Sequence, residues 1–217
     1  MSLEYGKSMG NIIHNEYDAL GRLARSRQGS SSSLQRTYAY NVRSQLTSSA
    51  SPLFTEKIYY ESPRGNGATP CFNGDISSVS WSEKTAVAKT SDMRHYDYSY
   101  DALDRLTDSS YSDYKNRTGF FDTDYIYDKQ GNILDLSRNN VDPTDNTRTK
   151  LVDDASFRYD GNQLMAYSDI GMETSSQDIT LPDNYDAYGV LDGSVQFSYD
   201  ACGNMTANTN KGIVKMN

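Results

Sequence analysis

Histidines, cysteines and paired carboxylates are the residues of this 217-residue chain that could do chemistry. The two histidines, His14 and His95, have no second metal ligand at helical or hairpin spacing. The two cysteines, Cys71 and Cys202, each stand beside a turn sequence, without the close spacing of a zinc site or a disulfide framework. We therefore expect the histidines on strand surfaces and the cysteines as two unrelated thiols, although a Cys71–Cys202 disulfide stays open.

Aspartates occur in close pairs along the chain. These pairs are Asp122 and Asp124, Asp142 and Asp145, Asp153 and Asp154, and Asp183 and Asp186. A glycosidase needs two carboxylates at a set distance across a rigid cleft, and the sequence singles out no pair for that role. The stretch from Asp142 to Asn146 has calcium-loop character but lacks the Gly and distal Glu of an EF-hand, so a solvated loop is the interpretation and a weak calcium site the alternative. We expect no catalytic residue, no cofactor and no metal site.

The charge balance restricts the partners. The chain carries 29 acidic and 21 basic residues, a formal net charge of −8, and phosphate backbones repel such a surface. Nucleic acid is therefore not an expected partner. No apolar stretch approaches the length of a membrane-spanning helix, and residues 1–9 lack the apolar run of a secretory signal. We expect residues 1–9 to be a leader or a degenerate repeat end.

The elements that would position these residues repeat along the chain. Tyr17–Leu23 reads YDALGRL and Tyr100–Leu106 reads YDALDRL. Related motifs, each an aromatic residue followed by Asp or Asn, start at Tyr17, Tyr40, Phe72, Tyr100, Tyr127, Tyr159 and Tyr199. Structural units recur in this manner, whereas catalytic residues seldom do. The repeat therefore indicates a fold built from repeated structural units.

Each motif predicts the turn of a β-hairpin. The Asp or Asn side chain can accept a hydrogen bond from a backbone N–H two residues on, and the residue three positions after it suits a left-handed position in a type I turn with a G1 bulge. Glycine fits that position best and Asp104 next best, but Ser44 fits less well, so we expect the second turn to differ. Asn73-Gly74 and Asp160-Gly161 are pairs typical of two-residue hairpins.

The predicted turn residues form the candidate site of this chain, with a structural role. They are Tyr17, Asp18, Gly21, Tyr40, Asn41, Asn73, Gly74, Tyr100, Asp101, Asp104, Tyr127, Asp128, Gly131, Tyr159, Asp160, Gly161, Tyr199, Asp200 and Gly203.

The flanking residues favour strands. In five motifs a second aromatic residue stands two positions earlier, as Tyr38 does before Tyr40, which places both rings on one strand face. A lone hairpin is marginal in water, so neighbouring hairpins must pair edge to edge. The sequence predicts an all-β fold over residues 1–217, with tandem hairpins in one extended, curved antiparallel sheet and no second domain. Any short helix would lie in 83–93, and open sheet edges would favour self-association.

Repeated YDxxGRL and YDxxGN units on tyrosine-rich strands resemble the YD repeats of the Rhs family. The teneurin shells and the large subunits of insecticidal Tc toxins carry similar repeats. Phe72–Trp81, Tyr159–Leu164 and Tyr199–Ile213 resemble Rhs-type proteins of Bacteroidetes bacteria in particular. The resemblance extends from about residue 10 to residue 217.

This resemblance implies a β-solenoid sheet that spirals into a hollow shell. In whole family members the shell can encapsulate a C-terminal effector or toxin, and the proteins are secreted or displayed at the cell surface, often for interbacterial competition. Asp142-Pro143 is followed by Thr144 and not by Gly, so the self-cleaving segment that ends such shells is not matched, and self-cleavage and toxin activity do not carry over.

We therefore expect a structural fragment of a larger secreted or surface protein, with the remainder of the parent chain as its partner. The alternative is a carbohydrate- or protein-binding surface module. An enzyme ranks last, because no pocket of converging carboxylates or metal ligands is indicated.

Overall fold

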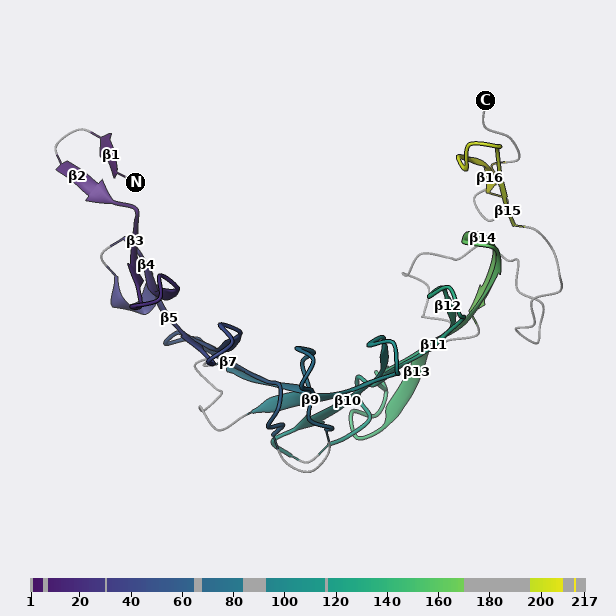
Figure 1. Ribbon diagram of the computed structural model, residues 1–217. Helices are drawn as coiled ribbons and strands as arrows, with labels where there is room; N and C mark the ends of the chain where they lie inside the picture. The colour runs from purple at the N-terminus through teal and green to yellow at the C-terminus, as the bar shows by residue number, and fades with distance from the viewer. Residues whose placement is uncertain are drawn as a thin grey trace. The chain divides into compact units, whose positions relative to one another are not determined.

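The computed structural model describes residues 2–5, 8–29, 31–64, 68–83, 93–115, 117–169, 196–208 and 213, and nearly all of the regular secondary structure among them is β-strand. Sixteen strands and one short 3-10 helix, η1 (Ser32–Leu34), occur among these residues (Figure 1). The predicted all-β fold is confirmed. No helix of the described residues is long and apolar enough to cross a membrane.

Twelve strands make one antiparallel sheet in which each strand pairs with the next along the chain. They are β3 (Ile13–Tyr17), β4 (Leu23–Gln28), β5 (Gln35–Tyr40), β6 (Leu46–Ala50), β7 (Phe54–Tyr59), β8 (Ser78–Glu83), β9 (Arg94–Tyr100), β10 (Leu106–Asp113), β11 (Thr123–Tyr127), β12 (Ile133–Val141), β13 (Thr149–Asp160) and β14 (Gln163–Asp169). Two further hairpins pair β1 (Ser2–Tyr5) with β2 (Ser8–Asn11), and β15 (Phe197–Tyr199) with β16 (Met205–Asn208). Tandem hairpins that pair edge to edge, as predicted, are therefore the architecture.

The chain divides into two compact units, and each is built from hairpins of the same kind. One unit comprises Met1–Ser99 with Tyr111–Thr118, and the other comprises Tyr100–Ser110 with Gly119–Asn217. In both units the hairpin turns carry the repeated motif, so the motif sets the local geometry of each unit.

The first unit has an aromatic and a hydroxyl-rich strand face. Trp81 of β8 stacks on Tyr96 of β9 with ring centroids 5.6 Å apart, and Tyr96 meets the buried Tyr111 edge-on at 5.5 Å. On the alternate positions of β8, Ser78 and Ser80 are fully buried. Alternation along β8 thus separates rings from hydroxyls, as period-two geometry requires.

The second unit is held by a row of rings across three strands. Phe157 of β13 stacks on Tyr167 of β14 at 6.3 Å, and Tyr167 stacks on Phe197 of β15 at 6.2 Å. Gln196 donates its backbone N–H to the Met165 carbonyl at 2.8 Å, so the β15 hairpin continues the array beside β14.

The third motif does not form a hairpin tip of its own. Strands β7 and β8 pair directly, with Tyr59 opposite Ser78, and Phe72, Asn73 and Gly74 lie in the connection between them. Phe72 is 67% exposed, whereas Tyr60 is 9% exposed. The interpretation of Asn73-Gly74 as a two-residue hairpin was wrong, because Tyr60 is the aromatic residue that packs at this point of the array.

The sixth motif forms a two-residue hairpin one position later than predicted. Asp160 ends β13 and pairs with Gln163, so the loop residues are Gly161 and Asn162. Gly161 has φ +58°, the sign that a type II′ turn requires at its first central residue. The prediction that Asp160 and Gly161 form the central pair was therefore wrong, since Gly is needed first in this turn type.

The second turn does not differ from the others, contrary to the expectation from Ser44. Ser44 adopts the left-handed conformation with φ 63°, close to the 60° of Asp104, and its N–H bonds to the Asn41 carbonyl at 3.0 Å. The hydrogen bonds of this turn outweigh the steric cost at Ser44. Of the helix expected in 83–93, Glu83 ends β8 and residues 84–92 lie outside the described residues.

Replacing Ser44 with Gly should stabilise the fold, because glycine reaches positive φ without a Cβ clash. We expect the free energy of unfolding to rise by roughly 0.5–1 kcal/mol after the added entropy of the unfolded chain is subtracted. Urea denaturation would measure it, with Gly131→Ser as the reciprocal variant that should lose stability at φ +95°. A destabilised Ser44→Gly variant would contradict the conformational argument.

Candidate functional site

Asp18 closes the first hairpin turn with both of its carboxylate oxygens. Its Oδ1 accepts the backbone N–H groups of Leu20 and Arg22, each at 2.9 Å, and its Oδ2 accepts Nε of Arg22 at 2.7 Å. The Gly21 N–H bonds to the Asp18 carbonyl at 3.0 Å, and Gly21 has φ +76°. This is a type I turn with a G1 bulge whose polar groups are satisfied by one short side chain. We call the segment from this Asp or Asn to the residue four positions later a corner.

The same corner recurs at four other motifs. In each one Oδ1 of the first residue accepts two backbone N–H groups, two and four residues on, at 2.8 to 3.1 Å. These corners are Asn41–Gln45, Asp101–Arg105, Asp128–Asn132 and Asp200–Asn204. The left-handed position is held by Ser44, Asp104, Gly131 and Gly203.

The last residue of a corner matches the chemistry of its first. Arg105 donates Nε, and Asn132 and Asn204 donate Nδ2, to the carboxylate that starts their corner. Asn41 has an amide N–H₂ in place of a second acceptor, and its Nδ2 donates to Oε1 of Gln45 at 2.6 Å. An acidic start therefore takes a donor, and an amide start takes an acceptor.

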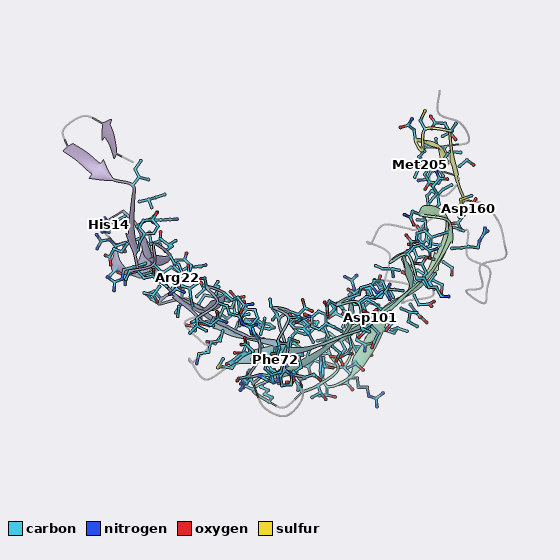
Figure 2. The ribbon with its side chains drawn as sticks, viewed as in Figure 1. His14, Arg22, Phe72, Asp101, Asp160 and Met205 are labelled. Carbon is cyan, nitrogen blue, oxygen red and sulfur yellow. The ribbon has the colours of Figure 1, made fainter. Side chains whose placement is uncertain are left out.

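Side chains at the corners also reach forward to the next motif. Nη1 of Arg22 donates to the Asn41 carbonyl at 3.1 Å, and Nη1 of Arg105 donates to the Asp128 carbonyl at 2.6 Å. Nδ2 of Asn132 donates to the Gly161 carbonyl at 3.1 Å. Figure 2 marks Arg22 and Asp101 at two of these turns. Successive turns are thus tied to one another as well as closed within themselves.

Tyrosine hydroxyls reach back to the preceding hairpin. Each donates, at 2.7 to 3.0 Å, to a carbonyl at the start of an adjoining strand, which is the first residue of β4, β6 and β10 and the second residue of β14. The pairs are Tyr40 with Leu23, Tyr60 with Leu46, Tyr127 with Leu106, and Tyr199 with Leu164. We call these four bonds the hydroxyl ladder.

Sequence reasoning assigned the rings to packing and missed the hydroxyls. A signal was present, because six of the seven motif starts are Tyr, whereas Phe also occurs two positions earlier, at Phe157 and Phe197. Arginine completes the contact at two corners, where the guanidinium of Arg22 lies 4.8 Å from the Tyr40 ring centroid and that of Arg105 lies 4.7 Å from Tyr127.

One further corner was also missed. Oδ1 of Asp113 accepts the backbone N–H groups of Lys115 and Arg117 at 2.9 and 3.1 Å, and Oδ2 accepts Nε of Arg117 at 2.8 Å. The Asp113 side chain is fully buried, unlike those of Asp18 and Asp101. The signal was the Asp–Arg spacing that Asp18 and Arg22 share, but Ser112 stands where the motif has Tyr, so a search on the motif did not include this segment.

The carboxylates that start the corners have lowered pKa values. A side-chain hydrogen bond from the last residue of the corner is the largest cause of the lowered pKa of Asp101, Asp128 and Asp200, and the Arg22 backbone N–H is the largest cause at Asp18. Burial acts to raise the pKa of Asp113, but the hydrogen bonds from Arg117 and Lys115 outweigh it and the pKa is lowered.

Among the described residues, His95 lies in a polar cluster that resembles a catalytic set. Ser112 Oγ is 2.5 Å from its Nε2, Asp97 Oδ2 is 3.8 Å from the same nitrogen, and Arg64 Nη1 is 2.9 Å from Nδ1. A relay needs the carboxylate and the nucleophile each aligned on its own ring nitrogen. Here Ser112 Oγ lies between the two nitrogens, 3.0 Å from Nδ1 as well, and Arg64 also contacts Nδ1. Burial is the largest cause of the lowered pKa of His95 and of the raised pKa of Asp97.

The remaining candidates are held by local contacts. Oδ1 of Asp142 accepts both the N–H and the hydroxyl of Thr144, and Asp145 does the same with Thr147. No group of three or more His, Cys, Asp or Glu that could hold a metal occurs among the described residues. Cys71 and Cys202 are not joined in a disulfide. Asp183 and Asp186 lie outside the described residues.

Comparison with known proteins finds distant similarity to solved structures. No family model and no curated protein matches the chain. Among solved structures, a Tc holotoxin pore of Photorhabdus luminescens with a substitution in its TccC3 component matches at 12% identity and a TM-score of 0.18. The match covers 89% of this chain and 14% of that chain, so this chain spans a small part of its length. A likeness at this level does not establish the fold or the role of this chain.

The hydroxyl ladder predicts a cost for removing a single oxygen. Tyr127→Phe should lower the free energy of unfolding by about 1 kcal/mol, because the Leu106 carbonyl loses its donor. Tyr17→Phe is the matched control, since Tyr17 is 61% exposed and the loss of its hydroxyl should change the free energy of unfolding little. Equal effects of the two substitutions in urea denaturation would contradict a stabilising ladder.

The buried corner should be the more sensitive one. Asp113→Ala leaves the Lys115 and Arg117 amides without their acceptor, and we expect a loss of roughly 2 kcal/mol in the free energy of unfolding. Asp101→Ala removes the same bonds at a corner open to water and should cost less. Thermal denaturation of both variants would decide, and a larger loss at Asp101 would refute the ranking.

Stability should fall in acid because the corner carboxylates have lowered pKa values. Such groups stabilise the fold above their unfolded pKa, and the contribution is lost as the pH falls through the folded pKa, so the main loss is expected below about pH 4. His95, with its lowered pKa, adds a smaller loss below about pH 6.5, whereas the raised pKa of Asp97 acts in the opposite direction. Urea denaturation across this pH range measures the free energy of unfolding at each pH. Unchanged stability below pH 4 would contradict the stabilising role of the corner carboxylates.

Proposed function

We propose that this chain is a structural YD-repeat segment of an Rhs-like protein, which forms part of a β-sheet wall and has no chemistry of its own. By the family resemblance, the wall belongs to a shell that can enclose a C-terminal effector or toxin. The same resemblance favours secretion or display at the cell surface and makes the remainder of the parent chain the principal partner.

The hydroxyl ladder is the observation that carries this proposal. A Tyr hydroxyl of one hairpin bonds to a backbone carbonyl of the preceding hairpin at Leu23, Leu46, Leu106 and Leu164. A bond between consecutive hairpins contributes nothing to a ligand site, but it makes each hairpin depend on its neighbour. That dependence is what a continuous wall requires.

The aromatic faces favour a wall over the carbohydrate-binding alternative. Sugars bind to aromatic residues through an open ring face, but Tyr96 is stacked between Trp81 and Tyr98, at 5.6 and 6.0 Å. At the corners, arginine guanidinium groups lie over the rings of Tyr40 and Tyr127. Rings that are covered by each other or by arginine support the sheet rather than present a sugar platform.

A neighbour-dependence experiment tests the wall. In hydrogen exchange, Tyr127→Phe should speed exchange in β10 and β11, which the bond to the Leu106 carbonyl joins, and in β12, which pairs with β11. The reason is that a wall hairpin takes part of its stability from its neighbours. Tyr17→Phe is the control and should leave these strands unchanged. A carbohydrate array completes the test, and specific binding of one sugar class, with exchange unchanged in Tyr127→Phe, would replace the wall by the binding module.

A further inference from the structure

Strand β3 has an open backbone edge. Of the described strands only β4 pairs with it, and β1 and β2 pair with each other in a separate sheet. The side chains of all five β3 residues are exposed, among them Ile13 at 46% and Tyr17 at 61%. An edge that shows both its backbone groups and apolar side chains is a site for pairing with another strand.

The register of β3 on β4 fixes which groups face outward. Gly29 donates its N–H to the Ile12 carbonyl, and Asp18 donates its N–H to the Arg22 carbonyl. Inward and outward backbone groups alternate along an antiparallel strand, so even-numbered residues bond to β4. The N–H and C=O groups of Ile13, Asn15 and Tyr17 therefore point to the open edge.

The outward groups are self-complementary about Asn15. If a second β3 approaches antiparallel with Asn15 opposite its own copy, Ile13 lies opposite Tyr17 and His14 lies opposite Glu16. The outward N–H and C=O groups of all three odd residues then find partners. Ile13 and Tyr17 make an apolar–aromatic pair on one face, and His14 with Glu16 makes a pair of opposite character on the other.

We propose that β3 is a homodimer interface, in which two copies of this chain pair antiparallel through β3 with Asn15 on the twofold axis. The inference does not depend on the proposed wall role, because it uses only the edge of β3. Glu16 already lies 2.8 Å from Arg25 and 3.6 Å from His14 of its own chain, so the pairing brings His14 of the second copy to this carboxylate without replacing either partner. Because the contact is isologous, assembly closes at two copies.

Sedimentation velocity of the full chain, from about 5 to about 200 µM, tests the proposal in the weak range expected of a small interface. We expect a concentration-dependent monomer–dimer equilibrium without larger species. A monomer at every concentration would overturn the proposal, and so would open-ended growth, because growth requires a head-to-tail contact between different edges.

Asn15→Pro removes the N–H at the centre of the interface and leaves the β4 ladder intact, since that N–H faces outward and proline is tolerated on edge strands. Dimerisation should weaken roughly tenfold or more, because two hydrogen bonds are lost across the axis. Asn15→Ala is the matched control and should dimerise as the parent does. Circular dichroism confirms that both variants keep the fold, and an Asn15→Pro variant that dimerises like the parent would overturn the proposal.

A charge exchange tests the register itself. Glu16→Lys places two basic side chains opposite each other and should weaken dimerisation. Adding His14→Glu to that variant restores an acidic residue opposite a basic one and should recover the dimer, although both variants carry the same Lys beside Arg25. Failure of the double variant to recover would refute the pairing about Asn15.

Discussion

A short polar side chain that accepts two backbone N–H groups at once is the interaction on which the rest of this structure depends. Oδ1 of Asp18, Asn41, Asp101, Asp128 and Asp200 does so at the turn of its hairpin. Turn amides that would need water are satisfied locally, and the chain reverses in a fixed geometry. With the reversals fixed, the strands have one register, and their side chains fall on defined faces.

The use of polar side chains for structure also explains how a chain with 36% hydrophobic residues forms so many strands. Tyrosine supplies ring area to the faces and uses its hydroxyl to join hairpins, while arginine at the corners covers ring faces and bonds to the next turn. Buried serines, among them Ser78 and Ser80, occupy positions where a thick core would carry large apolar groups. Polar contacts between neighbouring hairpins thus supply much of the stabilisation that apolar packing supplies in a globular core.

The fold class and the positions of five turns could be predicted because they depend on local chemistry. These turns start at Asp18, Asn41, Asp101, Asp128 and Asp200. Asp or Asn with a left-handed residue three positions later marks a turn wherever it occurs, and the strand pairing follows from the order of the hairpins. The residues that pack beside each turn could not be predicted, because they depend on contacts distant in sequence. Tyr60 displaced Phe72 as the packed aromatic residue, and Ser44 accepted a left-handed conformation because the bonds of Asn41 hold it there. The buried corner at Asp113 lacks the tyrosine that identified the others, so a search on the full motif passed over it.

Amide hydrogen exchange at single-residue resolution is the most direct measurement of the corner interaction. The N–H groups of Arg22, Arg105 and Asn132 donate to side chains and not to a strand ladder. If the corners hold as described, these amides exchange on the order of a hundredfold or more slower than in an unstructured chain at neutral pH. Exchange at the unstructured rate, with the neighbouring strands still protected, would contradict the central role of the corners.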